Sequence, residues 1–260
     1  MKKTLLISTL GICILLSGGG AAAKTPNPGA VRMALRNFGD ADLRAEAVQA
    51  ATAIAEGLGA DAEEDKAFFT GRDLRGWNGT MKYWHVQDNA VIGGSDDAIP
   101  CNEFLWSEVP VANFYLAVDV KLTPPTANAG IQFRSKKVDE HGQALGYQAD
   151  VGEGWWGKLY HEHGRKMLDA NDRAEKVVKP GGWNRYEILA VGPAIWTAIN
   201  GTLCTALLDL DGEAAGHIAL QIHSGAPQTV RYRIRKLVHN PKVEIAGMDA
   251  KQLIAELAKK

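Results

Sequence analysis

The strongest constraint on the fold is a β pattern that begins at Phe68 and continues to about Val238. Short alternations of apolar and polar residues are separated by turn signals of the kind that bound strands. Spacing of this kind is typical of a sandwich or a barrel. We therefore predict an all-β fold, with turns at Gly76, Asn78-Gly79, Gly93-Gly94, Pro124-Pro125, Gly142, Gly181-Gly182 and Asn200-Gly201, the last of which predicts a tight hairpin.

Three of the predicted strands combine an apolar side with a side of glutamine and a charged residue. They read Ala-Asn-Ala-Gly-Ile-Gln-Phe-Arg-Ser at 127–135, Gly-Tyr-Gln-Ala-Asp-Val at 146–151 and Ala-Leu-Gln-Ile-His-Ser at 219–224. Successive side chains of a strand point to opposite faces, so Gln132 and Arg134 would lie opposite Ile131 and Phe133. The pattern predicts a sheet with a functional outer face that carries Gln132, Arg134, Gln148, Asp150, Gln221 and His223.

The first 23 residues have the features of a secretory signal peptide. Lys2 and Lys3 precede an apolar run at 5–16, and three alanines at 21–23 form a small-residue cleavage site. The apolar run is short for a membrane span. We expect a periplasmic or secreted protein that has no membrane contact once the signal is removed.

The segment that follows is predicted to be a linker and a helix, at 24–65. Its Ala-rich part at about 40–58 places Leu43, Ala47, Ala51 and Ile54 at helical spacing. A helix of small residues is better suited to packing against a domain or a partner than to catalysis. We expect the β domain at 66–240 and a C-terminal tail at 241–260, with a short amphipathic helix at 249–257.

Composition gives weaker indications. Cys101 and Cys204 allow one disulfide in an exported protein, although two buried thiols are the favoured interpretation. The formal net charge of -1 gives no reason to expect nucleic acid as a partner. Seven tryptophans in such a chain hint at contact with sugar, because indole faces stack on the apolar faces of sugars.

An ordered set of motifs resembles the 3-keto-disaccharide hydrolase family, which was once a domain of unknown function. The set starts with Phe-Thr-Gly-Arg-Asp-Leu-Arg-Gly-Trp at 69–77 and Trp-His-Val-Gln-Asp-Asn-Ala-Val-Ile-Gly-Gly at 84–94. It continues through 102–105, 128–134, 146–150, 156–160, 182–184, 200–201 and 220–223. Asn89 replaces a frequent glycine of the family, which is a mild change because asparagine tolerates a left-handed backbone.

The resemblance implies a two-sheet antiparallel jelly roll of the concanavalin type, with a carbohydrate site on one sheet. It also implies cleavage of glycosides whose C3 hydroxyl has been oxidised to a ketone, so the expected partner is a 3-keto-glycoside. Such chemistry needs a base, a group that stabilises the ketone oxygen and an acid. We assign Asp150 as the carboxylate and Arg134 as the cation near the oxygen, the alternative being a surface ion pair.

Further residues are assigned to the site with a structural alternative for each. His223 could act as acid, base or hydroxyl ligand, and Glu162 with Arg165 is the next acid–base candidate. Gln132, Gln148 and Gln221 suit vicinal hydroxyls, unless they belong only to a solvated face. The substrate-binding candidates beyond these are Trp155 and Trp156, of which at least one is expected in the core, and Tyr160 and Glu103.

Two histidines at 161 and 163 raise the question of a metal. On a strand His161 and His163 would share one face, and Asp150 or His223 would have to supply a third ligand. No cofactor is otherwise predicted, and a divalent metal ion is kept as an alternative. For the whole protein, the alternatives to an enzyme are a carbohydrate-binding module without catalysis and an interaction domain that docks through its N-terminal helix.

Overall fold

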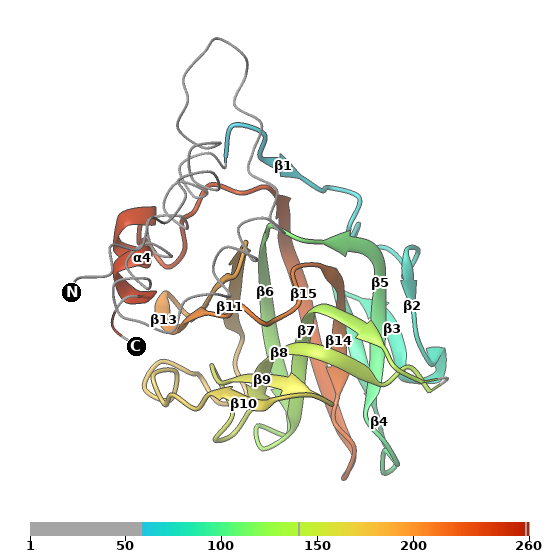
Figure 1. The fold of residues 1–260 in the computed structure, drawn as a ribbon. Coiled ribbons are helices and arrows are strands. Elements are labelled where there is room, and N and C mark those ends of the chain that lie inside the picture. The colour runs from blue at the N-terminus through green and yellow to red at the C-terminus, as the bar shows by residue number, and fades with distance from the viewer. Residues whose placement is uncertain (1–58, 140, 258, 260) are drawn as a thin grey trace, which may run out of the picture.

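A computed structural model describes residues 59–139, 141–257 and 259 of the chain. In these residues the protein is a sandwich of two antiparallel sheets with one short helix at its edge (Figure 1), which confirms the all-β jelly roll. The predicted signal peptide and the predicted helix at 40–58 lie outside the described residues. No helix in the described residues is long and apolar enough to cross a membrane.

The first sheet has the strand order β13-β12-β11-β6-β15-β4-β3, and β1 pairs with β15. Neighbours that are far apart in sequence, such as β6 and β15, give the sheet its crossover topology. Its strands are β1 (Glu63–Glu64), β3 (Trp84–Gln87), β4 (Ala90–Ser95), β6 (Phe114–Thr123), β11 (Asn184–Val191), β12 (Ala194–Ile199), β13 (Thr202–Leu208) and β15 (Gln228–His239).

The second sheet has the order β10-β9-β8-β7-β14-β5-β2 and contains the three strands with a glutamine. The 3-10 turn η1 (Met81–Tyr83) precedes β3. The strands of this sheet are β2 (Trp77–Asn78), β5 (Glu103–Val111), β7 (Asn128–Lys137), β8 (Ala144–Gly152), β9 (Leu159–Glu162), β10 (Lys166–Asp169) and β14 (Gly216–Ile222).

The core between the sheets is built by the apolar positions of the alternating pattern. Ile131 and Phe133 of β7 and Leu220 and Ile222 of β14 are fully buried in one cluster with residues of the other sheet. Tyr232 of β15 also belongs to this cluster and crosses it, because its hydroxyl lies 2.6 Å from the Gln221 carbonyl oxygen and 3.0 Å from that of Gly130. The alternation therefore predicts correctly which side of these strands faces the core.

Local turn chemistry is as predicted at two turns, whereas Gly93 and Gly94 lie inside β4, so the turn predicted there is wrong. Asn200 and Gly201 join β12 to β13 with φ values of 50° and 80°, which is the left-handed backbone that a two-residue hairpin requires. Asn89 has a φ of 57° in the turn between β3 and β4, so the asparagine does adopt the expected left-handed conformation.

The helix α4 (Ala250–Leu257) lies where the sequence predicts a tail helix, beside β13 (Figure 1). The side chains of Asp249 and Gln252 each accept a hydrogen bond from the other residue's backbone N–H, at 2.9 and 3.0 Å, which is a capping box. Leu253 and Leu257 are buried against the outer side of β11 to β13, where Trp196 Nε1 donates to the Leu253 carbonyl. The helix thus covers an apolar outer patch of the first sheet.

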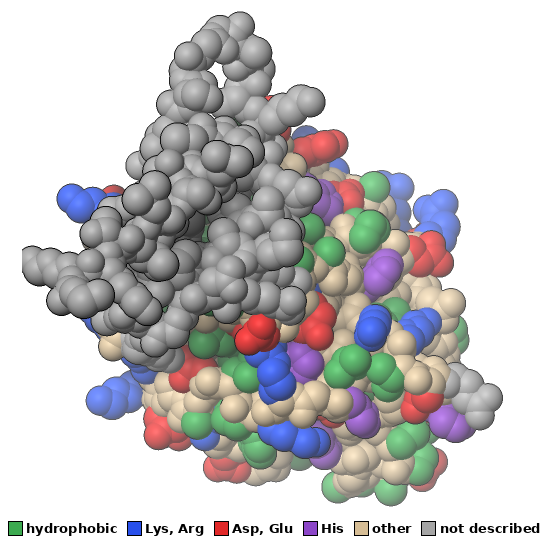
Figure 2. Space-filling model, in the orientation of Figure 1, with side chains coloured by type: hydrophobic (Ala, Val, Ile, Leu, Met, Phe, Trp, Pro, Cys, Tyr) green, Lys and Arg blue, Asp and Glu red, His purple; other side chains and the backbone are tan. Residues whose placement is uncertain are grey.

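The two cysteines do not form the disulfide that the composition allows. Cys101 is exposed and Cys204 is buried, and both are free thiols. The favoured interpretation of two buried thiols is therefore wrong for Cys101. On the face that Figure 2 shows, basic, acidic and histidine side chains are interspersed, in keeping with a net charge near zero.

Candidate functional site

The outer face of the second sheet brings together the glutamines and the aspartate that the sequence singles out. In the register of the sheet, Gln221 lies opposite Gly130, which lies opposite Asp150. On the next row of the same face, Gln132 lies opposite Gln148. All four polar side chains are at least 95% buried, and buried polar groups need partners.

A directed chain of hydrogen bonds ends on the Asp150 carboxylate. Ser135 Oγ donates to Gln132 Oε1 over 2.9 Å, and Gln132 Nε2 donates to Gln148 Oε1 over 2.5 Å. Gln148 Nε2 then donates to Asp150 Oδ1 over 2.6 Å. Each amide accepts at its oxygen and donates at its nitrogen, so the chain fixes one orientation for every member and holds the carboxylate by one oxygen.

The second oxygen of Asp150 is not held by this chain of hydrogen bonds. Oδ2 is buried and has no hydrogen-bond partner among the described residues. The pKa of Asp150 is raised from its usual 3.8 to about 7, chiefly by burial. The Gln148 hydrogen bond and the charge of Lys158 act to lower this pKa, and the negative charge of Glu162 acts to raise it. A carboxyl with a pKa near neutral can accept or donate a proton at physiological pH.

Gln221 is the second group with unused hydrogen-bonding capacity. Both its Nε2 and its Oε1 are buried without a partner in the described part of the chain. The close packing of Gln148 on this row requires a glycine at position 130, because a Cβ there would lie 2.6 Å from Gln148 Cδ. Tyr232 fixes the backbone of this row from the core side through the Gly130 and Gln221 carbonyls. The strand pattern thus places on the row of Asp150 an amide whose nitrogen and oxygen both lack a partner among the described residues.

Residues of β9 and of the end of β14 border the row of Asp150 on this face. Tyr160 pairs with Gln148 and Glu162 pairs with Gly146, so both belong to the face of Asp150, as predicted. Lys158 precedes β9, and its carbonyl oxygen accepts from the Asp150 N–H over 3.1 Å. His223 follows β14, and its N–H donates to the Asn128 carbonyl one row beyond Gln221, at the rim of the face.

Arg134 does not lie beside Asp150, which corrects the predicted pairing. Its φ of 48° belongs to an irregularity in the pairing of β7 with β8, so that Ser135 and not Arg134 follows Gln132 on the outer face. The guanidinium donates to the Ala112 carbonyl over 2.8 and 2.6 Å and to the Gly192 carbonyl over 2.7 Å. Arg134 therefore ties two loops at one end of the sandwich and lies away from the candidate site.

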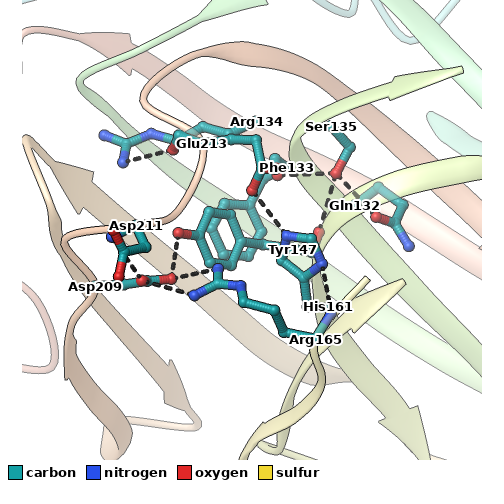
Figure 3. A network of polar contacts seen from close by, with 10 residues as sticks. All are labelled: Gln132, Phe133, Arg134, Ser135, Tyr147, His161, Arg165, Asp209, Asp211 and Glu213. Carbon is teal, nitrogen blue, oxygen red and sulfur yellow. Dashed lines mark hydrogen bonds and ion pairs between the residues drawn. The ribbon is translucent and has the colours of Figure 1, made fainter. Parts of the chain in front are cut away.

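Arg165, predicted to bind substrate, and His161, considered as a metal ligand, belong to a polar cluster around Asp209 and Glu213 (Figure 3), which corrects the predicted place of Arg165. Arg165 donates to both oxygens of Asp209 over 2.8 and 2.6 Å, and Tyr147 donates to the same carboxylate over 2.6 Å. His161 is buried, and its Nε2 lies 2.8 Å from Glu213 Oε2. Tyr147 is a core residue, so this cluster lies on the opposite face of β8 and β9 from Asp150.

The electrostatics of the cluster are those of a structural ion pair. Burial acts to raise the pKa of Asp209, but the hydrogen bonds from Arg165 and Tyr147 lower it below its ordinary value. Burial and the hydrogen bond to Asp209 raise the pKa of Tyr147 well above its usual range. Asp209 is therefore ionised and satisfied, and it stabilises the end of the sandwich.

The two histidines do not form a metal-binding pair. His161 points toward the core, whereas His163 is exposed in the following turn with a φ of 49° and its Nδ1 lies 2.9 Å from the Ala144 carbonyl. The strand ends at Glu162, so the assumption that both histidines alternate along one strand is wrong. In residues 59–139, 141–257 and 259, no group of three or more potential ligands could hold a metal ion.

The remaining predicted residues divide between core, rim and surface. Trp156 is a core residue, as expected for one of the pair, and Trp155 is 41% exposed in the loop after β8. Glu103 pairs with the core residue Ile222, so it lies on the other side of β5 from the site, with Oε1 3.7 Å from Cys101 Sγ. Its assignment to substrate binding is therefore wrong.

Sequence reasoning missed several residues of this face. Phe104 and Trp106 of β5 pair with Gln221 and Ala219, and their ring centroids lie 6.1 Å apart. They alternate with the core residue Leu105, and this signal was available in the sequence. Ser135 could not be recognised because its position depends on the irregularity at Arg134.

Comparison with known proteins supports a carbohydrate-related fold. A family model described as the 3-keto-alpha-glucoside-1,2-lyase-like domain matches residues 64–237. A candidate glycosyl hydrolase of known structure from Parabacteroides distasonis superposes with a TM-score of 0.51 at 15% identity, covering 66% of this chain and 92% of that protein. At this identity the likeness shows the fold.

Two further structures are similar at lower scores. A second candidate glycosyl hydrolase from the same species has a TM-score of 0.48 at 17% identity and covers 68% of this chain and 98% of its own. The carbohydrate-binding module CBM66 from Bacillus subtilis has a TM-score of 0.44 at 16% identity and covers 62% and 94%. A search of curated proteins found no match.

Proposed function

Because the chain belongs to the family of 3-keto-α-glucoside-1,2-lyase-like domains, we propose that it cleaves 3-keto-glycosides at C1. The observation that carries this proposal is the Asp150 carboxyl, with a pKa of about 7 and one unpartnered oxygen among the described residues, on a row with the amide of Gln221. Export through the signal at residues 1–23 is part of the same proposal.

The chemistry follows from the acidity of the hydrogen at C2, next to the ketone. A base removes this proton, the electron pair forms the C1–C2 double bond, and the C1 substituent leaves with a proton from an acid. Addition of water across C1 and C2 of the resulting 2-hydroxyglycal completes a net hydrolysis. A group that carries the proton in both steps needs a pKa near the working pH.

In this mechanism Asp150 Oδ2 accepts the proton from C2. The chain through Ser135, Gln132 and Gln148 holds Oδ1, so that the free oxygen has a fixed position. Gln221 Nε2 and the ammonium group of Lys158 replace Arg134 as the candidate donors to the ketone oxygen, on which negative charge develops. Glu162 and His223, at the edges of the same face, are the candidates for the acid at the leaving group.

A carbohydrate-binding module without catalysis is the second candidate. It is favoured by the aromatic pair Phe104 and Trp106 beside the glutamines, since aromatic rings and amides are sufficient to bind sugar. Such a module would gain nothing from a buried carboxyl whose pKa is raised, because an uncompensated buried charge costs stability. A catalytic function therefore explains the buried Asp150 carboxyl better than a binding module does.

One assay separates the two functions. The purified protein is incubated with a 3-keto-glucoside, and the alkaline ultraviolet absorbance of the substrate is followed with time. The Asp150→Asn variant should lose about 100-fold or more of kcat, as expected for loss of a general base. An Asp88→Asn variant, in the exposed turn between β3 and β4 of the other sheet, should retain it. Tight binding of the substrate with no turnover by the native protein would contradict the enzyme and support the function of a binding module.

The same assay tests the metal alternative and the proposed location. Complete chelation should leave the rate unchanged if the residues of this face act alone, whereas loss of activity that zinc or calcium restores would contradict the mechanism. Fractionation of cells that produce the full chain should recover the activity in the periplasm or the medium, and activity retained in the cytoplasm would contradict export.

A further inference from the structure

A second polar surface, unrelated to Asp150, lies on the outer face of the first sheet. The sequence alternates basic and apolar residues at 231–238, and Arg231 and Arg233 lie on the outer side of β15 while Tyr232 is in the core. Lys121 of β6 lies directly opposite Arg231. Like charges in direct opposition across strands are unfavourable, so this arrangement calls for a compensating anion.

The nearby carboxylate is already occupied. Asp119 lies opposite Arg233, but it accepts hydrogen bonds from Arg185 Nε and, over 2.6 Å, from Arg235 Nε, and both of these arginines are about 40% exposed. Across the described ranges, no carboxylate pairs with Lys121, Arg231 or Arg233. We call these three side chains the cation row.

An aromatic ring lies beside the cation row. The guanidinium of Arg233 lies 4.3 Å from the ring centroid of Trp183, which directly precedes β11 and is partly exposed. The contact holds the guanidinium over the indole ring. A partly exposed indole next to cations suits a ligand that combines a ring with a negative charge.

A groove of about 670 Å³ continues the surface from the cation row. It reaches the row at Ile92, which pairs with Arg231, and at Thr229 of the same strand. Its volume is within the range of small-molecule sites. The groove mixes basic, hydroxyl and acidic side chains, including Lys82, Tyr83, His85, Ser95, Asp96 and Asp97.

We propose that the groove and the cation row together bind an acidic oligosaccharide, a sugar chain that carries carboxylate groups. The cation row would pair with the carboxylates, and the hydroxyl and carboxylate side chains of the groove would hold sugar hydroxyls. Asp96 and Asp97 can accept hydrogen bonds from sugar hydroxyls and repel anions, so the carboxylates of the ligand are expected at the cation row and the hydroxyls of its rings in the groove. The site is on the opposite sheet from Asp150, so it is independent of the proposed catalytic function.

The test compares oligogalacturonate with its methyl-esterified form, which has the same sugar rings and no carboxylate charge. In titration calorimetry of the full chain, the acidic oligomer should bind at least about 10-fold more tightly, and its affinity should fall as salt is raised. Equal affinity for the two oligomers, or no binding of either, would overturn the proposal. Tighter binding of a single-stranded DNA oligonucleotide would also overturn it.

Matched variants locate the site. The Lys121→Gln, Arg231→Gln double variant should lose about 10-fold or more of the affinity for oligogalacturonate. The control is Lys242→Gln with Lys251→Gln, which removes two exposed charges elsewhere and should change the affinity less than about 2-fold. Equal losses in the two double variants would refute the location, and unchanged melting temperatures verify that both fold.

Discussion

Replacement of Asp150 by asparagine should change how the stability of the protein depends on pH. The asparagine side chain keeps an acceptor oxygen for Gln148 and cannot ionise, so the substitution removes the charge with little change in shape. In the native protein, the pKa of Asp150 is raised to about 7, chiefly by burial. The folded state therefore favours the protonated acid, and ionisation of the buried group destabilises it.

The sign and the size of the effect follow from this difference. The stabilisation associated with the protonated carboxyl is fully present below the unfolded pKa and is lost as the pH rises through the folded pKa. Between a usual pKa of 3.8 and a folded pKa of about 7, the loss amounts to roughly 4 kcal/mol at about 1.4 kcal/mol per pH unit. The Asp150→Asn variant does not lose this stability, because asparagine cannot ionise.

The assay is urea unfolding of the native protein and the variant at several pH values between 4 and 8. The difference in the free energy of unfolding, variant minus native, should rise by roughly 4 kcal/mol across this range, and the melting-temperature difference by about 10 °C. All other titrating groups are common to both proteins and cancel. A difference that stays constant with pH would refute the burial of an ionisable Asp150 and, with it, the argument for its role in proton transfer.

Three further substitutions test the separation of the site from the frame of the fold. Gly130→Ala should displace Gln148, because the added Cβ would lie 2.6 Å from its Cδ. This should lower kcat in the cleavage assay about 10-fold and the stability by about 1–3 kcal/mol. Unchanged kinetics would contradict the role of the hydrogen-bond chain in positioning Asp150. Arg134→Met should cost roughly 2–5 kcal/mol in urea unfolding, because buried carbonyls lose their charged donor, while KM of the folded enzyme stays the same; a selective rise in KM would restore Arg134 to the site. Arg165→Met should lower the free energy of unfolding at pH 7. The difference in this free energy between the native protein and the variant should shrink as the pH falls below about 4, because the lowered pKa of Asp209 gives a stabilisation that is lost when this carboxylate is protonated. A difference that persists in acid would show that packing, and not the ion pair, is responsible.

Several features of the fold could be predicted because they depend on neighbours in sequence. Turn residues with a left-handed backbone, such as Asn200 and Gly201, are chosen by local sterics, so the hairpin is evident without any tertiary information. The alternation that buries Ile131 and Phe133 is equally local. It placed Gln132, Gln148, Asp150 and Gln221 correctly on one face of one sheet.

The errors arise where one backbone angle or one remote contact decides the outcome. A single left-handed residue at Arg134 breaks the period of two, so the side chain that the alternation assigns to the site ties two loops instead. The prediction that His163 shares a strand face with His161 is wrong for the same reason, because His163 has a left-handed backbone and β9 ends one residue before it. Glu103 lies one position out of phase with Phe104, and the register with β14 places Phe104, and not Glu103, on the polar face.

The amino-acid sequence by itself determined the all-β class, hairpin turns such as the one at Asn200 and Gly201, and the set of polar residues along the three glutamine-containing strands, because these depend on local conformation and period. Only the tertiary structure decided what those residues can do. The pairing of β7, β8 and β14 buries Asp150 among amides and separates it from Arg134. The raised pKa of Asp150 is a property of that burial, since the same carboxyl on an exposed strand would titrate at its ordinary value.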